Sequence, residues 1–332
     1  MTRKRDSSTS PATPSAAASV AARSGLFTPV RDAVTGNWVD RHAPPAWRPY
    51  LRLSRMDRPI GTWLLWIPCL WAITLAASID GWRWFDLWLV AGSGIGALLM
   101  RGAGCTWNDI QDRRIDAAVA RTASRPIPAG AVTARQAAVW MVAQALTAFL
   151  ILLTFNTTAI AWGIAACLPV AVYPFAKRFT YWPQAFLGLA FNWGALLLWI
   201  AHSGEVAWPA VLLYLAGIVW TLHYDTIYAH QDREDDAIIG VKSTARLFGK
   251  MTKPWLVAFT VLAAGAVTAA AGMAGSGPFG LMAGVALGTH MLWQVRATDI
   301  DDPERCMQVF RTTRIGGLGV AGLFLLEGMP GL

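Results

Sequence analysis

The stretch FDLWLVAGSGIGALLM, Phe85–Met100, leads after a short interval into NDIQDRRID, Asn108–Asp116. The first segment is almost wholly apolar, whereas the second gathers three carboxylates and an asparagine. A further apolar run begins near Ala137. Apolar runs that approach about 20 residues are typical of membrane-spanning helices. The acidic segment is therefore predicted to lie where such a helix leaves the bilayer.

The composition of the whole chain supports a membrane protein. Of its 332 residues, 55% are hydrophobic and 14% are charged, whereas soluble domains carry about 25% charged residues. Many of the 18 Trp flank apolar runs, where their amphipathic rings favour the lipid headgroup level. The four Cys show no CxxC spacing, so they are interpreted as buried thiols and not as a disulfide or zinc framework.

Nine segments are candidate spans, and most reach the roughly 17–25 residues that a bilayer requires. Several contain Gly or Pro, which transmembrane helices tolerate. The chain is therefore predicted to be an all-α, polytopic membrane protein with about nine transmembrane helices. The candidate spans are residues 60–79, 85–105, 135–155, 157–175, 183–202, 207–224, 254–274, 278–295 and 315–331.

The basic residues are distributed unevenly over the connections between these spans. All 28 Lys and Arg except Arg83 fall on the side that holds the N-terminus. The positive-inside rule then places the N-terminus in the cytoplasm or an equivalent compartment, and the C-terminus outside. The net charge of +8 is explained by this topology, so nucleic acid is not expected as a partner.

The N-terminal segment differs from the rest of the chain. It is small, polar and Pro-containing, which predicts a disordered tail over residues 1–45 and a transmembrane domain over residues 46–332. The tail lacks the apolar core of a signal peptide. Its Arg-, Ser- and Ala-rich, acid-poor composition also fits a mitochondrial transit peptide. We interpret it as a cytoplasmic tail at a bacterial inner membrane, with the mitochondrial inner membrane as the alternative.

The first acidic motif, Asn108–Asp116, has a helical spacing. Asn108, Asp112 and Asp116 stand at i, i+4 and i+8, which places them in one stripe on a helix, whereas Asp109 is turned about 100° away. The simpler interpretation is a solvated loop helix, in which the carboxylates pair with the neighbouring Arg113 and Arg114.

A second acidic motif, Tyr224–Asp236, begins where another apolar span ends on the same face. Asp225, Asp232 and Asp236 again share a helical stripe. Two facing carboxylate stripes would repel each other unless they were neutralised. Carboxylate and amide oxygens without His or Cys suit Mg²⁺, which readily takes a substrate phosphate as a further ligand. His230 lies within the motif and is interpreted as a neighbour and not as a ligand.

Basic residues follow each acidic motif, namely Arg121 and Arg125 after the first and Lys242 and Arg246 after the second. Arg binds phosphate bidentately and Lys acts as a point charge, although cytoplasmic loops collect such residues for topological reasons alone. Two stripes of Mg²⁺-binding side chains, each followed by basic residues, predict a diphosphate site. Because apolar helices stand behind it, the substrate is expected to be a lipid diphosphate, whose allylic carbocation an apolar pocket would shield from water.

These motifs resemble a known family. NDxxDxxxD and DTxYAxxDxxDD look like the intramembrane aromatic prenyltransferases of the UbiA superfamily, and RMDRPIGTWLLWIPCLWA, RPIPAG, YPFAKRFTYWPQ and GVKSTARLFG resemble its 4-hydroxybenzoate polyprenyltransferase branch. The resemblance covers about residues 45–315. One departure is Thr313, where the branch tends to show Asn.

The resemblance implies helices around a central cavity and Mg²⁺-dependent transfer of a polyprenyl group from its diphosphate to the ring of 4-hydroxybenzoate, in ubiquinone biosynthesis. It also implies roles for individual residues. One Mg²⁺ would be bound by Asn108, Asp112 and Asp116, of which the two aspartates also count as catalytic, and the other by Asp232 and Asp236. Asp225 would lie near the reacting centre, and the diphosphate would contact Arg121, Arg125 and Lys242. The carboxylate of the aromatic acid would bind Arg178, or else Arg55.

Two alternatives remain open. The acceptor could be of the menaquinone, haem O or chlorin type. The chain could instead be a non-enzymatic ion-coupled transporter, although transporters usually place such charges near the bilayer midplane. A soluble prenyl diphosphate synthase is excluded by the number of apolar runs.

Overall fold

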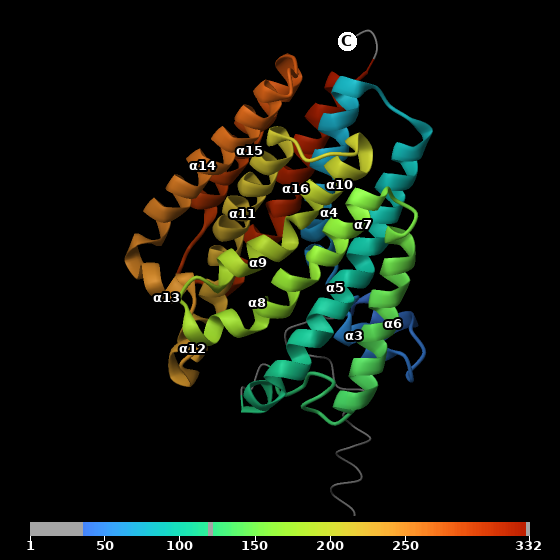
Figure 1. Ribbon diagram of the computed structural model, residues 1–332. Coiled ribbons are helices and arrows are strands. Elements are labelled where there is room, and N and C mark those ends of the chain that lie inside the picture. Colours follow the sequence, from blue (N-terminus) through green and yellow to red (C-terminus); the bar gives the residue numbers. More distant parts are fainter. Residues whose placement is uncertain (1–35, 119–121, 330–332) are drawn as a thin grey trace, which may run out of the picture.

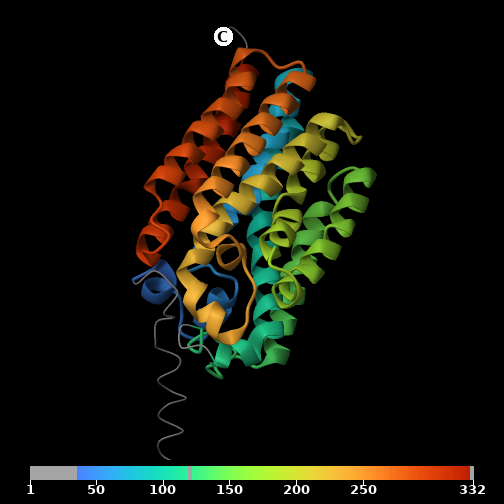
Figure 2. The ribbon, with the colours of Figure 1, turned by 90° about the vertical axis from the view of Figure 1, so that its left-hand side faces the viewer.

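The computed structural model describes residues 36–118 and 122–329 of the chain, and within these ranges every regular element is a helix. The long helices run side by side along one axis of the molecule (Figure 1). The short helices α12 and α13 lie at the same end as the C-terminal end of α5 and the start of α6, and the C-terminus lies at the other end (Figures 1 and 2). The predicted all-α class is confirmed.

The helices follow one another with short connections. Their bounds are α2 (Trp38–His42), α3 (Arg48–Leu53), α4 (Ile60–Asp80), α5 (Trp84–Ala118), α6 (Ala134–Leu152), α7 (Thr157–Ala165), α8 (Cys167–Phe179), α9 (Pro183–Phe191), α10 (Trp193–Ser203), α11 (Trp208–Ala229), the 3₁₀ turn η1 (His230–Asp232), α12 (Arg233–Ile239), α13 (Thr244–Phe248), the 3₁₀ turn η2 (Gly249–Met251), α14 (Thr252–Met273), α15 (Pro278–Ala297) and α16 (Pro303–Glu327).

Eight helical segments of the described chain are long and apolar enough to cross a membrane. They correspond to all but one of the nine predicted spans. The exception is α15, which forms a helix as expected but is not among these eight segments. The last span was predicted at residues 315–331, whereas α16 begins at Pro303 and contains the preceding polar residues as well.

The predicted boundary of the N-terminal tail lies too far along the chain. Residues 1–35 are outside the described residues, but residues 36–45 include α2. Val39 of this helix is fully buried, and Asp40 pairs with Arg52 of α3 at 2.8 Å. Helix α2 therefore packs on the helical domain.

The core of the bundle is formed where α4, α11 and α16 meet. Trp71 and Trp220 are fully buried and their ring centroids lie 5.0 Å apart. The Trp71 indole N–H donates to the Gly317 backbone oxygen at 2.7 Å, and a Cβ at Gly317 would lie 2.7 Å from the Trp220 ring. The close helix approach requires a residue without a side chain at this position, and it holds α11 and α4 in fixed positions beside the cavities described next.

Candidate active site

A polar cavity of about 250 Å³ lies where both acidic motifs meet. Helices α5, α8, α9, α11 and α12, the turn η1 and the segment before α13 contribute to its wall. The cavity brings together most of the residues that the sequence selected, although Asp112 is not among its lining residues, and both acidic motifs contribute to its wall. Its charged and amide-bearing lining residues are Asn108, Asp116, Arg125, Lys177, Gln184, Asp225, Asp232, Asp236 and Lys242.

A larger, mostly apolar cavity of about 460 Å³ extends from there into the bundle. Its wall includes residues of α4, α5, α6, α7, α8 and α10, among them Leu65, Met100, Phe149, Leu152 and Trp193. The two cavities meet at residues that line both, so a molecule with a charged head and an apolar tail has a continuous place to bind. The shared residues are Asn108, Arg125, Tyr173, Tyr228 and Asp232.

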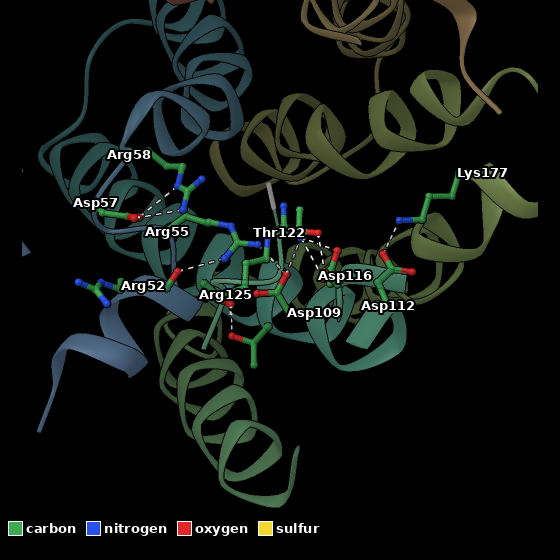
Figure 3. A network of polar contacts seen from close by, with 12 residues as sticks. Arg52, Arg55, Asp57, Arg58, Asp109, Asp112, Asp116, Thr122, Arg125 and Lys177 are labelled. Carbon is green, nitrogen blue, oxygen red and sulfur yellow. Dashed lines mark hydrogen bonds and ion pairs between the residues drawn. The ribbon is translucent and has the colours of Figure 1, made fainter. Parts of the chain in front are cut away.

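The carboxylates of the first acidic motif are buried and paired with cations from other elements. Asp112 is fully buried and accepts from Lys177, and its other oxygen lies 3.4 Å from Arg178 Nη2. Asp116 is 5% exposed and lies 3.0 Å from Arg125 Nη1 (Figure 3). Arg113 is exposed and donates to the Ile110 backbone oxygen. Buried carboxylates are not a solvated face, so the simpler interpretation of this motif is wrong.

Asp109 has a role that the sequence did not reveal. Its side chain is fully buried, 2.6 Å from Arg55 Nη2 and 3.5 Å from Arg125 Nη1 (Figure 3). Arg55 has a φ of 56°, the only positive value at a described residue other than Gly. Such a conformation costs roughly 1–3 kcal/mol and requires surrounding contacts to maintain it. Asp109 therefore links the loop before α4 to the loop after α5.

The second acidic motif is not one continuous α-helix, as the stripe argument had assumed. Helix α11 ends at Ala229, η1 spans His230–Asp232, and α12 follows as far as Ile239. Asp225, Asp232 and Asp236 nevertheless all line the polar cavity. A 3₁₀ turn has about three residues per turn, so the rotation per residue changes within the motif.

Only some of the basic residues predicted to bind substrate line one of the two cavities. Arg125 and Lys242 line the polar cavity, and Lys242 Nζ donates to the Phe179 backbone oxygen at 3.2 Å. Arg55 lines the apolar cavity. Arg178 is exposed, stacks at 5.2 Å over the Phe175 ring, and is not among the described residues that line either cavity. Arg121 lies outside the described residues.

The polar cavity is lined by oxygen donors of the kind that a divalent cation binds. Among the described residues, no three His, Cys, Asp or Glu side chains are already close enough to form a metal-binding group. The acidic and amide groups that line the cavity, from Asn108, Asp116, Asp225, Asp232 and Asp236, nevertheless offer oxygen ligands without thiolate or imidazole. Such a set fits a hard cation such as Mg²⁺.

Several residues that line the two cavities were not predicted from the sequence. Tyr173 and Tyr228 stand at the junction of the two cavities. Arg101 lines the apolar cavity on α5, its Nε is buried without a hydrogen-bond partner, and its guanidinium occupies the space that a side chain at residue 61 would fill. Its position seven residues before Asn108 puts it on the same helix face, and this spacing could have identified it.

This combination of an all-helical bundle, two acidic motifs and adjoining polar and apolar cavities matches one class of protein. Residues 65–318 match the UbiA prenyltransferase family, and the chain belongs to that family. Curated relatives named mitochondrial 4-hydroxybenzoate polyprenyltransferase come from Rattus norvegicus (49% identity, 83% of this chain and 74% of the relative) and Homo sapiens (48%, 83% and 74%). The relative of that name from Arabidopsis thaliana is 44% identical over 87% of this chain and 71% of its own length.

Solved structures support the fold. A UbiA homolog from Aeropyrum pernix superposes with a TM-score of 0.67 at 21% identity, over 81% of this chain and 99% of that chain. A UbiA homolog from Archaeoglobus fulgidus bound to GPP and Mg²⁺ has a TM-score of 0.58 at 17% identity, over 84% and 98%. The predicted resemblance is confirmed at the level of the family, and the protein is a multi-pass membrane protein.

Proposed function

We propose that this protein is a 4-hydroxybenzoate polyprenyltransferase, which moves a polyprenyl group from polyprenyl diphosphate to the ring of 4-hydroxybenzoate and releases diphosphate. The observation that carries the proposal is the junction of the two cavities. A cation- and carboxylate-lined chamber for a diphosphate opens into an apolar chamber for its tail. The names of the relatives support the choice of acceptor.

The diphosphate is proposed to bind between Arg125 and Lys242, with Lys177 as a third cation, because all three line the polar cavity. Arg121 stays a prediction for the same role. Arg125 and Lys177 also hold carboxylates of the first acidic motif. A diphosphate in the cavity therefore competes with Asp112 and Asp116 for the same cations.

Mg²⁺ is proposed as the cofactor. Asn108, Asp112 and Asp116 would hold one ion, and Asp232 and Asp236 a second. When bound, Mg²⁺ would neutralise the charge that develops on the departing diphosphate. The release of Asp112 and Asp116 from their cations would make their oxygens available as ligands, and it would free the cations for phosphate oxygens.

The chemistry is proposed to take place at the junction of the cavities. The bond between the allylic carbon and oxygen breaks, and its electron pair leaves with diphosphate. The ring carbon ortho to the hydroxyl of the acceptor forms the new carbon–carbon bond and the acceptor loses a proton, for which Asp225 is the proposed base. The faces of Tyr173 and Tyr228 suit a developing carbocation, and the apolar cavity excludes water from it.

The carboxylate of the acceptor needs a cation beside the reacting centre. Arg178 and Arg55 were the predicted candidates. Arg55 lines the apolar cavity but already holds Asp109. Arg101 lines the same cavity, and its Nε has no hydrogen-bond partner. We therefore propose Arg101 beside Arg55 as the anchor, with Arg178 retained as the competing candidate.

The location is proposed from the charge distribution and the relatives. The basic face, with the N-terminus, would be the cytoplasmic face of a bacterial inner membrane. The names of the relatives favour the alternative, the mitochondrial inner membrane with the same face in the matrix. Protease protection of an N-terminal tag in sealed vesicles or mitochondria tests the orientation.

A turnover assay tests the proposed function. Purified protein in detergent receives geranyl diphosphate and 4-hydroxybenzoate, with Mg²⁺ or with EDTA. Prenylated 4-hydroxybenzoate that forms only with Mg²⁺ is the expected result. Binding of geranyl diphosphate without product would direct attention to the menaquinone, haem O or chlorin type of acceptor. The absence of both product and binding would favour the ion-coupled transporter.

A further inference from the structure

Two histidines accompany two of the aspartates of the second acidic motif. His223 and His230 stand seven residues apart, as do Asp225 and Asp232, and each His precedes its Asp by two residues. Two residues correspond to about 200° of rotation in the α-helix that carries His223 and Asp225, and to about 240° in the 3₁₀ turn that carries His230 and Asp232. The histidines therefore face the opposite side of this helix from the aspartates, which line the polar cavity.

The side that the histidines face is covered by α14, which packs along α11 (Figure 1). His223 is fully buried, and its Nδ1 lies 3.2 Å from the backbone oxygen of Leu256 on α14. A carbonyl oxygen only accepts hydrogen bonds. Nδ1 of His223 must therefore carry the hydrogen in this contact.

His230 makes the corresponding contact one turn nearer the start of α14. It is 4% exposed, and its Nε2 lies 3.0 Å from the Thr252 hydroxyl. That hydroxyl donates its single hydrogen to the Gly249 backbone oxygen at 2.7 Å. With its hydrogen on the Gly249 oxygen, the Thr252 oxygen accepts from His230 Nε2. The alternative is a hydrogen on Nδ1, directed at the backbone of Ile300, and the tautomer decides between the two.

Both contacts lie in a water-poor environment. Thr252 and Leu256 are fully buried, and Leu222, Ile227 and Phe259 belong to the apolar cluster around them. A buried polar group that loses its partner is not compensated by water. The two hydrogen bonds therefore restrict rotation of α11 and η1 about their axis, and with it the direction of the two aspartates.

We propose that His223 and His230 are positioning residues that fix the rotation of α11 and η1 against α14 and thereby aim Asp225 and Asp232 into the polar cavity. The inference rests on the proposed function, because it gives these aspartates their task. Partners that orient the ligands of a metal typically change metal affinity or activity by roughly 10–100-fold when they are removed. Asp232 is a proposed metal ligand, so loss of the His230 contact should act on the metal and diphosphate side of the reaction and leave the KM for the acceptor unchanged.

Substitution of His230 and of its partner tests the proposal. His230→Leu and Thr252→Val should each raise the Mg²⁺ concentration for half-maximal activity and the KM for geranyl diphosphate roughly tenfold, with the KM for 4-hydroxybenzoate unchanged. The same variants should lose most of the rise in melting temperature that Mg²⁺ with geranyl diphosphate gives the wild type. His230→Gln, which can present an amide N–H to Thr252, should recover most of both effects.

Thr74→Val is the matched control, because Thr74 is a buried threonine of α4 whose hydroxyl donates to backbone oxygens of its own helix, away from α14. It should keep wild-type Mg²⁺ dependence. Lower thermal stability of His230→Leu with unchanged half-saturation and unchanged melting shift would overturn the proposal. A wild type that forms no product would instead contradict the proposed function.

Nitrogen NMR of ¹⁵N-histidine-labelled protein tests the geometry even where a variant fails to fold. The chain has five His, and His223→Asn and His42→Gln help to assign the signals. The expected result is hydrogen on Nδ1 of His223 and on Nε2 of His230. Hydrogen on Nε2 of His223 would remove its contact with Leu256 and overturn the proposal. Hydrogen on Nδ1 of His230 would contradict the direction assigned to its contact with Thr252.

Discussion

The two acidic motifs reach one cavity by different physical means. The first lies on the continuous helix α5, and its buried carboxylates are held by cations from the loop before α4, the loop after α5 and the end of α8. The second is interrupted by η1, and its backbone is held to α14 through the hydrogen bonds of His223 and His230. Ion pairs hold the buried carboxylates of the first motif, and hydrogen bonds of two histidine side chains attach the helix of the second motif to α14.

This difference predicts how substitutions in each motif affect the stability of the protein and its affinity for ligands. A buried ion pair that loses one partner leaves an uncompensated charge, which costs about 3–5 kcal/mol. A hydrogen bond between neutral groups contributes only about 0.5–1.5 kcal/mol. Substitutions in the first motif should therefore be severe, whereas those behind the second motif should mainly shift ligand affinities.

The largest effect is expected from Asp112→Asn. The amide cannot serve as an anionic metal ligand, and it leaves Lys177 and Arg178 without their carboxylate. We expect turnover with 4-hydroxybenzoate to fall about a thousandfold, equivalent to about 4 kcal/mol, while membrane insertion is retained. Initial rates with saturating substrates measure the change. Full activity would remove Asp112 from the metal site.

Asp109→Asn should act mainly on stability. It leaves the buried Arg55 and the half-buried Arg125 without the carboxylate that lies between them. We expect about 3 kcal/mol of destabilisation, measured by thermal unfolding in detergent. The variant Asp301→Asn is the control, because the carboxylate of Asp301 is 73% exposed in its pair with Arg233, and exposed pairs contribute about 0–1 kcal/mol. Equal loss in both variants would contradict a special role for Asp109.

The third prediction separates the candidates for the carboxylate of the acceptor. Arg101→Leu removes a cation that lines the apolar cavity, whereas Arg178→Ala removes one that contacts Asp112 and is not among the residues that line either cavity. We expect the KM for 4-hydroxybenzoate to rise roughly tenfold in the first variant, equivalent to the loss of a charge-assisted hydrogen bond, and less than threefold in the second. The opposite order would restore Arg178 as the anchor.

The smallest effect is expected from Arg113→Gln. Arg113 is exposed and donates to a backbone oxygen of its own helix, and exposed substitutions usually change stability by less than about 0.5 kcal/mol. Turnover should stay within twofold of the wild type. A large loss of turnover would mean that Arg113, a basic residue of the first motif itself, is as important for activity as Arg125 and Lys177.

The sequence by itself determined the class of protein and the position of the site. Apolar runs, the uneven charge distribution and the i, i+4 spacing of Asn108, Asp112 and Asp116 are local patterns, and they were sufficient to predict helical spans with two acidic motifs at one end. Helix periodicity relates residues within a few turns of one another. This is why the helix that carries Asn108, Asp112 and Asp116 was correctly predicted and why the break in the second motif at η1 was missed.

Only the tertiary structure decided which cation holds which carboxylate. Arg55 and Asp109 are 54 residues apart, and Lys177 and Asp112 are 65 apart. The junction formed by Tyr173 and Tyr228 likewise joins α8 to α11. No periodicity connects positions so distant, because their contact depends on how whole helices pack. The chemistry of the donors was therefore present in the sequence, but their partners and directions were set by the packing of the bundle.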